Sequence, residues 1–347
     1  MRSFLPILMT VAALAAACSP AAAPTPAAPA KAGSTTAPAA APARTETIRL
    51  AVSQLDSNFY SPIYIAIKEG FYQAEGIELD VKPVNPPTAT QALIANQFDI
   101  AHGAAPAFAA ALQGAGIKLI YTVAERSPYW VIAKRDIKTW TDLKGKKIGV
   151  SSTTGTQVVD ASRLLKLHGV SAEADGVQYV VPGGPGDSDK YAALKSGTID
   201  AGFFSGLGGV QAVLEGYPMI GDFAELKGLD YTLWATDSFM QSKPALLQGF
   251  VNATLKGVQI YKNNPERALK WNTEQFEGDA QSAEKLRELS SSWFLADGII
   301  SDAALKEGVG YRREALAQPS SVTEAQMVNF DFVKKANEVV RTAGFKP

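Results

Sequence analysis

A run of hydroxyl-bearing residues offers the most distinctive chemistry in this chain. Residues 151–156 read Ser-Ser-Thr-Thr-Gly-Thr and lie between a predicted strand and a predicted helix. The start of a helix presents free backbone N–H groups and the positive end of the helix dipole, which favour an anion. We therefore expect this segment to bind a carboxylate, sulfonate or phosphate, the alternative being that its hydroxyls only cap their own helix. The candidate ligand-binding residues are Ser152, Thr153, Thr154, Gly155 and Thr156.

A second group of candidates directly follows the first predicted strand. Phe59 and Tyr60 could form an aromatic wall for a ligand, because their rings offer flat apolar surface. Gln54 and Asn58 could supply hydrogen bonds beside that wall. The alternative is a loop that packs on the protein's own surface.

Further candidates end other predicted strands or lie near residues 126–129, between the first and second groups of alternating strands and helices. His102 and Gly103 end one strand, although a lone histidine is as typical of a structural hydrogen-bonding group. Arg126 could pair with an anionic ligand through two parallel hydrogen bonds, or it could form a salt bridge that joins these two groups of elements. Two glycine-rich turns could add backbone N–H groups, a ring and a hydroxyl, or could simply be turns. The remaining candidates, at the junction and in these turns, are Tyr129, Gly183, Phe204 and Ser205.

The hydrophobic pattern predicts alternating strands and helices that would position these residues. Short β-branched runs predict strands, and longer amphipathic stretches predict helices. Alternation with short connections is typical of open α/β sheets, which bind ligands at the carboxyl ends of their strands. The predicted strands are 47–52, 77–84, 98–101, 117–124, 130–133, 147–150, 177–181 and 199–204, and the predicted helices are 63–69, 88–96, 105–113, 156–168, 188–196 and 209–215.

Helical patterns replace this alternation from about Thr232 onward. Asn264 before Pro265 predicts a helix cap, and Ser321 with Glu324 predicts a capping box. The last third therefore predicts helices rather than a further sheet. They are expected at 243–262, 265–271, 282–294, 302–316 and 321–341.

Composition excludes several classes of site. The chain has 347 residues, a net charge of -1, 46% hydrophobic residues, one cysteine and two histidines. This is a globular composition, long enough for two domains, and its charge gives no reason to expect a nucleic-acid partner. One cysteine cannot form an intramolecular disulfide or a thiolate zinc site. Since His102 and His168 are the only imidazoles, a multi-histidine metal site is not expected either. We expect no metal site, and we also expect no cofactor.

The N-terminus predicts export. Residues 1–17 begin with a basic start, continue with a 14-residue apolar run from Phe4 to Ala17, and end in small residues before Cys18. That run is shorter than the roughly 20 residues that span a bilayer but fits a signal peptide. The small residues resemble a bacterial lipoprotein cleavage box, in which Cys18 would be acylated. The alternative is an ordinary secretory signal with Cys18 incidental.

The segment after the cysteine predicts a tether. Residues 19–46 contain 12 alanines and 6 prolines, so they cannot form an apolar face or a continuous helix. With Cys18, they predict a lipid-anchored linker at 18–46, so that the membrane is contacted only through the anchor.

Four stretches of sequence resemble the solute-binding proteins of bacterial ABC importers. They are residues 61–77, 91–101, 140–150 and 192–201, which read SPIYIAIKEGFYQAEGI, QALIANQFDIA, WTDLKGKKIGV and AALKSGTIDA. Within that family the chain resembles the nitrate/sulfonate/taurine-binding group, which is related to fungal thiamine-pyrimidine synthases. Each stretch alone is common, but the four occur in the family's order, and the resemblance extends over about residues 48–215.

The resemblance implies an α/β, type II-like periplasmic-binding-protein fold, in which two lobes close on a ligand in the cleft between them. Lobe 1 would comprise residues 47–131 and 229–347, and lobe 2 residues 132–228, with crossings near 127–132 and 228–234. It also implies a monomeric receptor that delivers a small organic solute, anionic or planar and aromatic, to an ABC permease.

Two other functions on the same fold stay open. A thiamine-pyrimidine-synthase-like enzyme is one, but residues 47–347 lack the cysteine-rich iron motif of the fungal enzymes. A sensor that signals its closed state to a partner is the other. A serine hydrolase is not expected, because the Gly-x-Ser-x-Gly turn is missing. We therefore expect no catalytic residues.

Overall fold

The computed structural model describes residues 45–347 except 54, 56–57, 104, 154–155 and 315–319. The predicted signal peptide, Cys18 and residues 19–44 of the predicted tether lie outside the described residues. No helix among those described combines the length and the apolar character that a membrane crossing requires.

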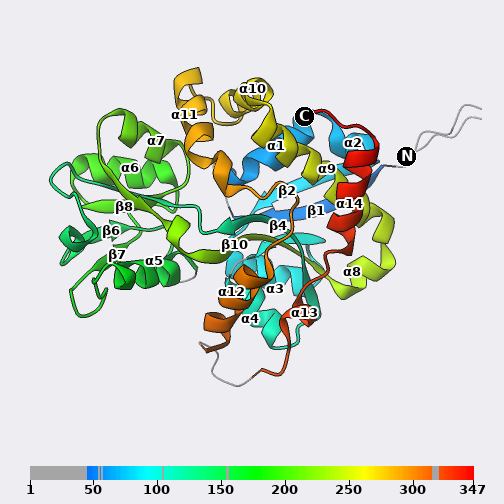
Figure 1. The fold of residues 1–347 in the computed structure, drawn as a ribbon, viewed down its shortest axis with the longest axis horizontal. Helices are drawn as coiled ribbons and strands as arrows, with labels where there is room; N and C mark the ends of the chain where they lie inside the picture. Colours follow the sequence, from blue (N-terminus) through cyan, green and yellow to red (C-terminus); the bar gives the residue numbers. More distant parts are fainter. Residues whose placement is uncertain (1–44, 54, 56–57, 104, 154–155, 315–319) are drawn as a thin grey trace, which may run out of the picture. The chain divides into compact units, whose positions relative to one another are not determined.

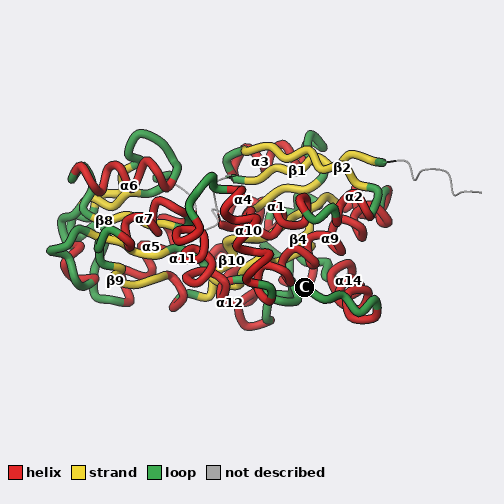
Figure 2. Tube along the Cα trace, turned by 90° about the horizontal axis from the view of Figure 1, so that it is seen from above, coloured by secondary structure: helices red, strands yellow, loops and turns green. Residues whose placement is uncertain are grey.

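The described strands form two five-stranded mixed sheets (Figures 1 and 2). The first sheet has the order β2-β1-β3-β10-β4, and β10 runs antiparallel to both of its neighbours. Its strands are β1 (Glu46–Val52), β2 (Ile77–Pro83), β3 (Ile100–Gly103), β4 (Ile117–Arg126) and β10 (Lys227–Thr236).

The second sheet repeats this plan with the order β7-β6-β8-β5-β9, and here β5 is the antiparallel strand between β8 and β9. The chain passes from the first sheet to the second between Arg126 and Trp130 and returns between Asp222 and Lys227. The strands are β5 (Trp130–Ala133), β6 (Lys147–Gly149), β7 (Gln178–Val180), β8 (Ala201–Phe204) and β9 (Met219–Asp222).

Helices cover both faces of the first sheet. One face packs against a core that includes Ile63, Phe250 and Val258, and the other against a core that includes Phe108 and Leu305. Asn264 caps one of these helices by accepting from the Arg267 N–H, as predicted. The helices around this sheet are α1 (Ser61–Lys68), α2 (Phe71–Ala74), α3 (Pro86–Ile94), α4 (Ala105–Leu112), α8 (Asp237–Ser242), α9 (Pro244–Asn263), α10 (Pro265–Gln275), α12 (Asp302–Glu314), α13 (Glu324–Met327) and α14 (Asp331–Thr342).

The second sheet is also covered by helices. Leu164 and Leu165 of α5 (Thr156–Leu167) pack with Phe203 and Phe223. The helices α6 (Asp187–Ser196) and α7 (Leu207–Leu214) lie together on the second sheet, and α11 (Ala280–Ser290) contacts α7. Short 3-10 helices occur at Asn58–Tyr60, Trp140–Leu143, Phe223–Glu225 and Ser291–Trp293. The predicted α/β fold with a helical last third is confirmed, and the structure shows in addition that both sheets are mixed.

Four local features of the structure differ from what the sequence predicted. The segment around 228–234 is a full strand of the first sheet, because β10 pairs on both edges and buries Tyr231, Leu233 and Trp234. The strand β9 was not predicted. The helix expected over 321–341 is two helices, because Val328 forms a bridge with Leu119 of β4 and interrupts it. The capping box there pairs Thr323 with Gln326 rather than Ser321 with Glu324.

Candidate ligand site between the sheets

Five buried aromatic rings form a continuous column that joins the two sheets. The His102 and Tyr231 rings lie 4.3 Å apart, and Tyr231 stacks on Phe59 at 4.3 Å. Phe59 in turn lies 6.3 Å from Trp293, which packs on Trp130 at 4.7 Å. Each of the five residues is less than a tenth exposed. We call these five residues the aromatic column; it begins at the carboxyl end of β3 and ends at the first residue of β5.

Asn58 places an unused hydrogen-bond donor next to this column. Its side chain is fully buried, and its Oδ1 accepts from the Tyr261 hydroxyl at 2.7 Å and from Ser61 Oγ at 3.4 Å. Within the described part of the chain, no group accepts from Asn58 Nδ2. A buried N–H group without an acceptor is costly and rare in proteins. It marks this position as one that can donate to a ligand.

Tyr60, the next aromatic residue, is also buried. Burial raises the pKa of its phenol to about 12, and the Tyr64 ring lies 6.2 Å away. Gly103 is packed so closely that a Cβ there would lie 2.4 Å from Trp234 Cδ1. The glycine therefore lets β3 approach the Trp234 indole of β10.

A buried ion pair lies at the carboxyl ends of the strands of the second sheet. Lys190 is 1% exposed, and its Nζ lies 2.7 Å from Asp187 Oδ1 one turn earlier on α6. The same ammonium donates to the carbonyl oxygen of Phe203 at 2.7 Å and to Ser151 Oγ at 3.2 Å. Lys190 thus joins the ends of β6 and β8 to the first turn of α6.

The Asp187 carboxylate also occupies the start of α7. Its Oδ2 accepts the backbone N–H groups of Ser205 at 2.8 Å and Gly206 at 2.5 Å. These donors precede Leu207, the first residue of α7, where an anion is ordinarily attracted. The protein's own carboxylate therefore occupies that position.

Gln157 connects the hydroxyl-rich segment to α5. Its Oε1 accepts the Ser151 N–H at 2.8 Å, and the residue is 7% exposed. No described group accepts from Gln157 Nε2, so a buried unused donor also lies near the carboxyl end of β6 in the second sheet. Ser152 and Thr153 are exposed, and Thr156 begins α5. Thr154 and Gly155 lie outside the described residues, as does Gln54.

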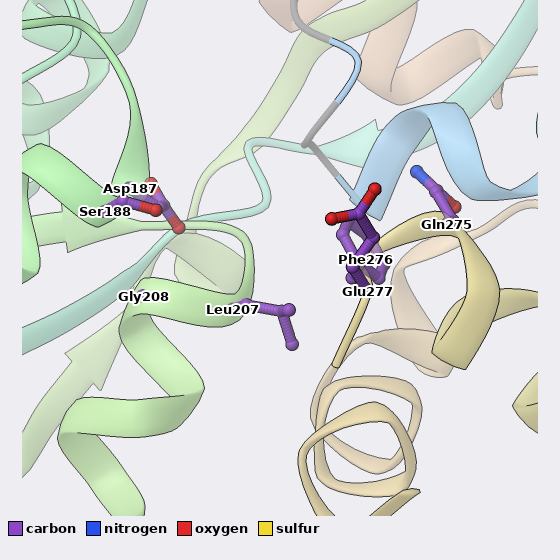
Figure 3. Close-up of a pocket in the computed structure, with 7 residues that line it drawn as sticks. All are labelled: Asp187, Ser188, Leu207, Gly208, Gln275, Phe276 and Glu277. Carbon is purple, nitrogen blue, oxygen red and sulfur yellow. The ribbon is translucent and has the colours of Figure 1, made fainter. Parts of the chain in front are cut away.

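A cavity of about 170 Å³ lies where α6 and α7 face the end of α10. Figure 3 shows its two walls opposite one another, with the Leu207 side chain pointing toward Phe276 and Glu277. Gln275 Nε2 donates to the Leu55 carbonyl oxygen at 3.1 Å, which ties this wall to the loop after β1. The lining residues are Asp187, Ser188, Leu207, Gly208, Gln275, Phe276 and Glu277.

A polar network beside the crossing joins α5 to α12. Asp160 is fully buried and accepts from Ser127 Oγ and, at 3.2 Å, from the Tyr311 hydroxyl. Arg163 lies 3.3 Å from Asp160 and 3.3 Å from Glu307, and its guanidinium stacks 4.0 Å from the Tyr311 ring centroid. This network connects an element of the second sheet to one that covers the first.

The structure distributes the predicted site residues unevenly. It gathers Asn58, Phe59, Tyr60 and His102 at the carboxyl ends of β1 and β3, although as buried groups rather than an exposed wall. Five further predicted residues lie in different settings. Phe204 is fully buried beneath Lys190, Ser205 binds Asp187, Tyr129 packs edge-on against Phe223 at 5.4 Å, Gly183 lines a shallow hollow beside α6, and Arg126 is exposed at the end of β4. Their contact with a ligand stays a prediction.

Sequence reasoning missed Asp187, Lys190, Tyr231 and Trp293. The i, i+3 spacing of Asp187 and Lys190 at a predicted helix start was visible, but it is equally typical of an exposed helical surface. Tyr231 and Trp293 lie 172 and 234 residues from Phe59 in the chain, so only the fold brings their rings together.

Two mixed sheets, each with one antiparallel strand supplied after a crossing, define the fold of periplasmic binding proteins. The aliphatic sulphonate-binding protein SsuA of Escherichia coli has this fold, with a TM-score of 0.64, 17% identity, and coverage of 82% of this chain and 92% of that one. The chain belongs to the NMT1/THI5-like family, whose model matches residues 58–268. The resemblance seen in the sequence is therefore confirmed.

Two curated relatives have different activities. One is 4-amino-5-hydroxymethyl-2-methylpyrimidine phosphate synthase of Legionella pneumophila, which is 26% identical over 64% of this chain and 71% of its own length. The other is the riboflavin-binding protein RibY of Chloroflexus aurantiacus, which is 27% identical over 76% of this chain and 73% of its own length.

Proposed function

We propose that this protein is a solute-binding receptor that holds a small, flat, aromatic solute between its lobes and delivers it to an ABC importer. The observation that carries the proposal is the aromatic column with the unused Asn58 donor beside it. Stacking on aromatic faces recognises a flat ring, and a directed N–H group recognises an acceptor on that ring's edge.

The column would open with the lobes. Phe59 and Tyr231 come from elements of the first sheet, whereas Trp130 begins β5 of the second. A hinge motion at the two crossings would therefore separate the rings and admit a ligand, and closure would bury it again. The sequence-based bounds, residues 47–131 and 229–347 for lobe 1 and 132–228 for lobe 2, would cut β5 and β10. We therefore propose lobe boundaries at the two crossings, before Trp130 and before Lys227, and we take the protein to be a monomer.

The curated relatives support a heteroaromatic ligand. One is named for riboflavin and the other for a pyrimidine phosphate. The cellular part of the proposal comes from the sequence: export by residues 1–17, acylation of Cys18, and a tether through residue 46 that keeps the receptor near a membrane permease.

The test is whether the purified protein binds a probe. Native mass spectrometry detects the bound probe, and a shift of the thermal unfolding midpoint reports its binding. Riboflavin and 4-amino-5-hydroxymethyl-2-methylpyrimidine are the aromatic probes, and taurine is the aliphatic control. We expect an aromatic probe to raise the midpoint with concentration and to be recovered unchanged. Chemical conversion of a probe would instead support an enzyme related to the pyrimidine synthase, and stabilisation by taurine alone would refute the aromatic class.

A further inference from the structure

We propose that Asp187 is a specificity-determining residue, an internal anion that excludes sulfonate, carboxylate and phosphate groups from the cavity between α7 and α10. The cavity would then accept an end of the ligand that donates hydrogen bonds and carries no negative charge. This inference rests on the proposed receptor function and names the chemical class that its site selects.

The first argument is occupancy of the backbone donors at the start of α7. Ser205 and Gly206 both donate to Asp187 Oδ2, so these N–H groups are not available to a ligand's anion. The packing also fixes this arrangement. A Cβ at Gly208 would lie 2.3 Å from the Asp187 carbonyl oxygen, so α7 rests directly on the first turn of α6.

The second argument is that all three N–H groups of the nearby Lys190 ammonium already have partners within the protein. The Lys190 ammonium has three N–H groups, and it has three partners: Asp187 Oδ1, the Phe203 carbonyl and Ser151 Oγ. Because Lys190 is 1% exposed, it cannot turn toward the cavity without leaving a buried carboxylate unpaired. An incoming anion would therefore meet no available positive charge here.

The third argument is the chemistry of the walls. Asp187 and Glu277 place one carboxylate residue on each side of the cavity, and Gln275 and Ser188 add further polar side chains. Among the described residues that line it, none is lysine or arginine. Carboxylates repel an anion but accept hydrogen bonds from hydroxyl, amino or ring N–H groups.

The decisive experiment removes the charge of Asp187 and asks whether an external anion takes its place. Asp187→Asn keeps the size of the side chain and an oxygen that can accept from Ser205 and Gly206. Asp187→Ala leaves room for a small ion. Asp189→Asn and Asp189→Ala are the matched controls, because Asp189 is on the same helix but is exposed and is not a residue of this cavity.

The measurement is the thermal unfolding midpoint of each full-length protein in formate and in methanesulfonate, with chloride at equal ionic strength as reference. We expect the anions to stabilise both Asp187 variants, with an affinity about tenfold above that of the wild type or the controls. Stabilisation of the wild type by methanesulfonate to the same extent would overturn the proposal. So would Asp187 variants that respond no more than the Asp189 controls.

A second measurement connects this result to the ligand. Riboflavin and riboflavin 5′-phosphate share one ring system and differ by a phosphate, so the ratio of their affinities reports exclusion of the anion. We expect the wild type to favour riboflavin, and Asp187→Asn to reduce that preference about tenfold. If neither flavin binds any variant, the flavin form of the proposed function fails, while the formate and methanesulfonate experiment still decides the role of Asp187.

Discussion

Replacing Phe59 by leucine tests the aromatic column most directly. Leucine keeps an apolar side chain but removes the ring that lies 4.3 Å from Tyr231 and 6.3 Å from Trp293. An aromatic pair contributes about 0.5–1.5 kcal/mol beyond the burial of its area, so losing two pairs should lower the free energy of unfolding by about 1–3 kcal/mol. Because Phe59 is 4% exposed, solvent cannot replace those contacts.

The assay is urea denaturation of the purified protein, followed by circular dichroism, with Phe71→Leu as the control. Phe71 is partly buried and makes one edge-on contact with Phe345 at 5.6 Å, so its replacement should cost less. A loss below about 0.5 kcal/mol for Phe59→Leu, or one equal to that of the control, would refute the stacking argument.

The same pair of variants separates stability from binding. If a flat ligand stacks on the column, Phe59→Leu should weaken binding of the aromatic probe about tenfold, which corresponds to about 1.4 kcal/mol. Phe71→Leu should leave that affinity unchanged. Equal affinities in both variants would contradict a ligand-binding role for Phe59.

Three further changes probe other parts of the molecule. Burial raises the pKa of Tyr60 from 10.0 to about 12, so the folded state holds this proton more tightly. The contribution of Tyr60 to stability should therefore be constant below pH 10 and be lost between about pH 10 and 12, and Tyr60→Phe should reduce the fall of stability over that range in urea melts at each pH. Tyr311→Phe removes the hydroxyl that donates to Asp160 and should cost about 1–2 kcal/mol in urea denaturation; an unchanged midpoint would contradict a structural role for this bond. Gly257→Ala would place a Cβ 2.1 Å from the Pro62 carbonyl oxygen, so α9 and α1 must separate, and calorimetry should show a loss of about 1–3 kcal/mol or more; a wild-type melting temperature would show that the helices can move apart without cost.

Local signals explain which elements could be predicted. The strand over Trp130–Ala133 agrees with the prediction to the residue, because four apolar residues stand between polar and turn-forming neighbours. In contrast, β10 was hidden because its middle residues are buried on both faces and show no alternation. The break between α13 and α14 was hidden too, because it depends on a contact with Leu119, about 200 residues earlier.

The residues of the candidate site also differ in whether local sequence or long-range contacts determine their position. Asn58 and Phe59 could be proposed from the sequence because they lie in the short segment after the first strand, which is information within a short stretch of sequence. Lys190 was not found, because lysine is rarely buried and its partner Ser151 lies 39 residues away. The charge at the carboxyl ends of the strands of the second sheet depends on the fold, because only the fold places the Asp187 carboxylate at the start of α7. The sequence-based expectation of an anionic ligand at residues 151–156 stays a prediction.

The order in which the strands are synthesised should shape how the molecule folds. All strands of the second sheet lie within residues 130–222, whereas the first sheet inserts β10 between β3 and β4 only after residue 227. The nascent N-terminal segment therefore lacks an inner strand until about 110 residues more have been made. Such delayed, non-local pairing slows folding, so we expect the first sheet to be completed later than the second.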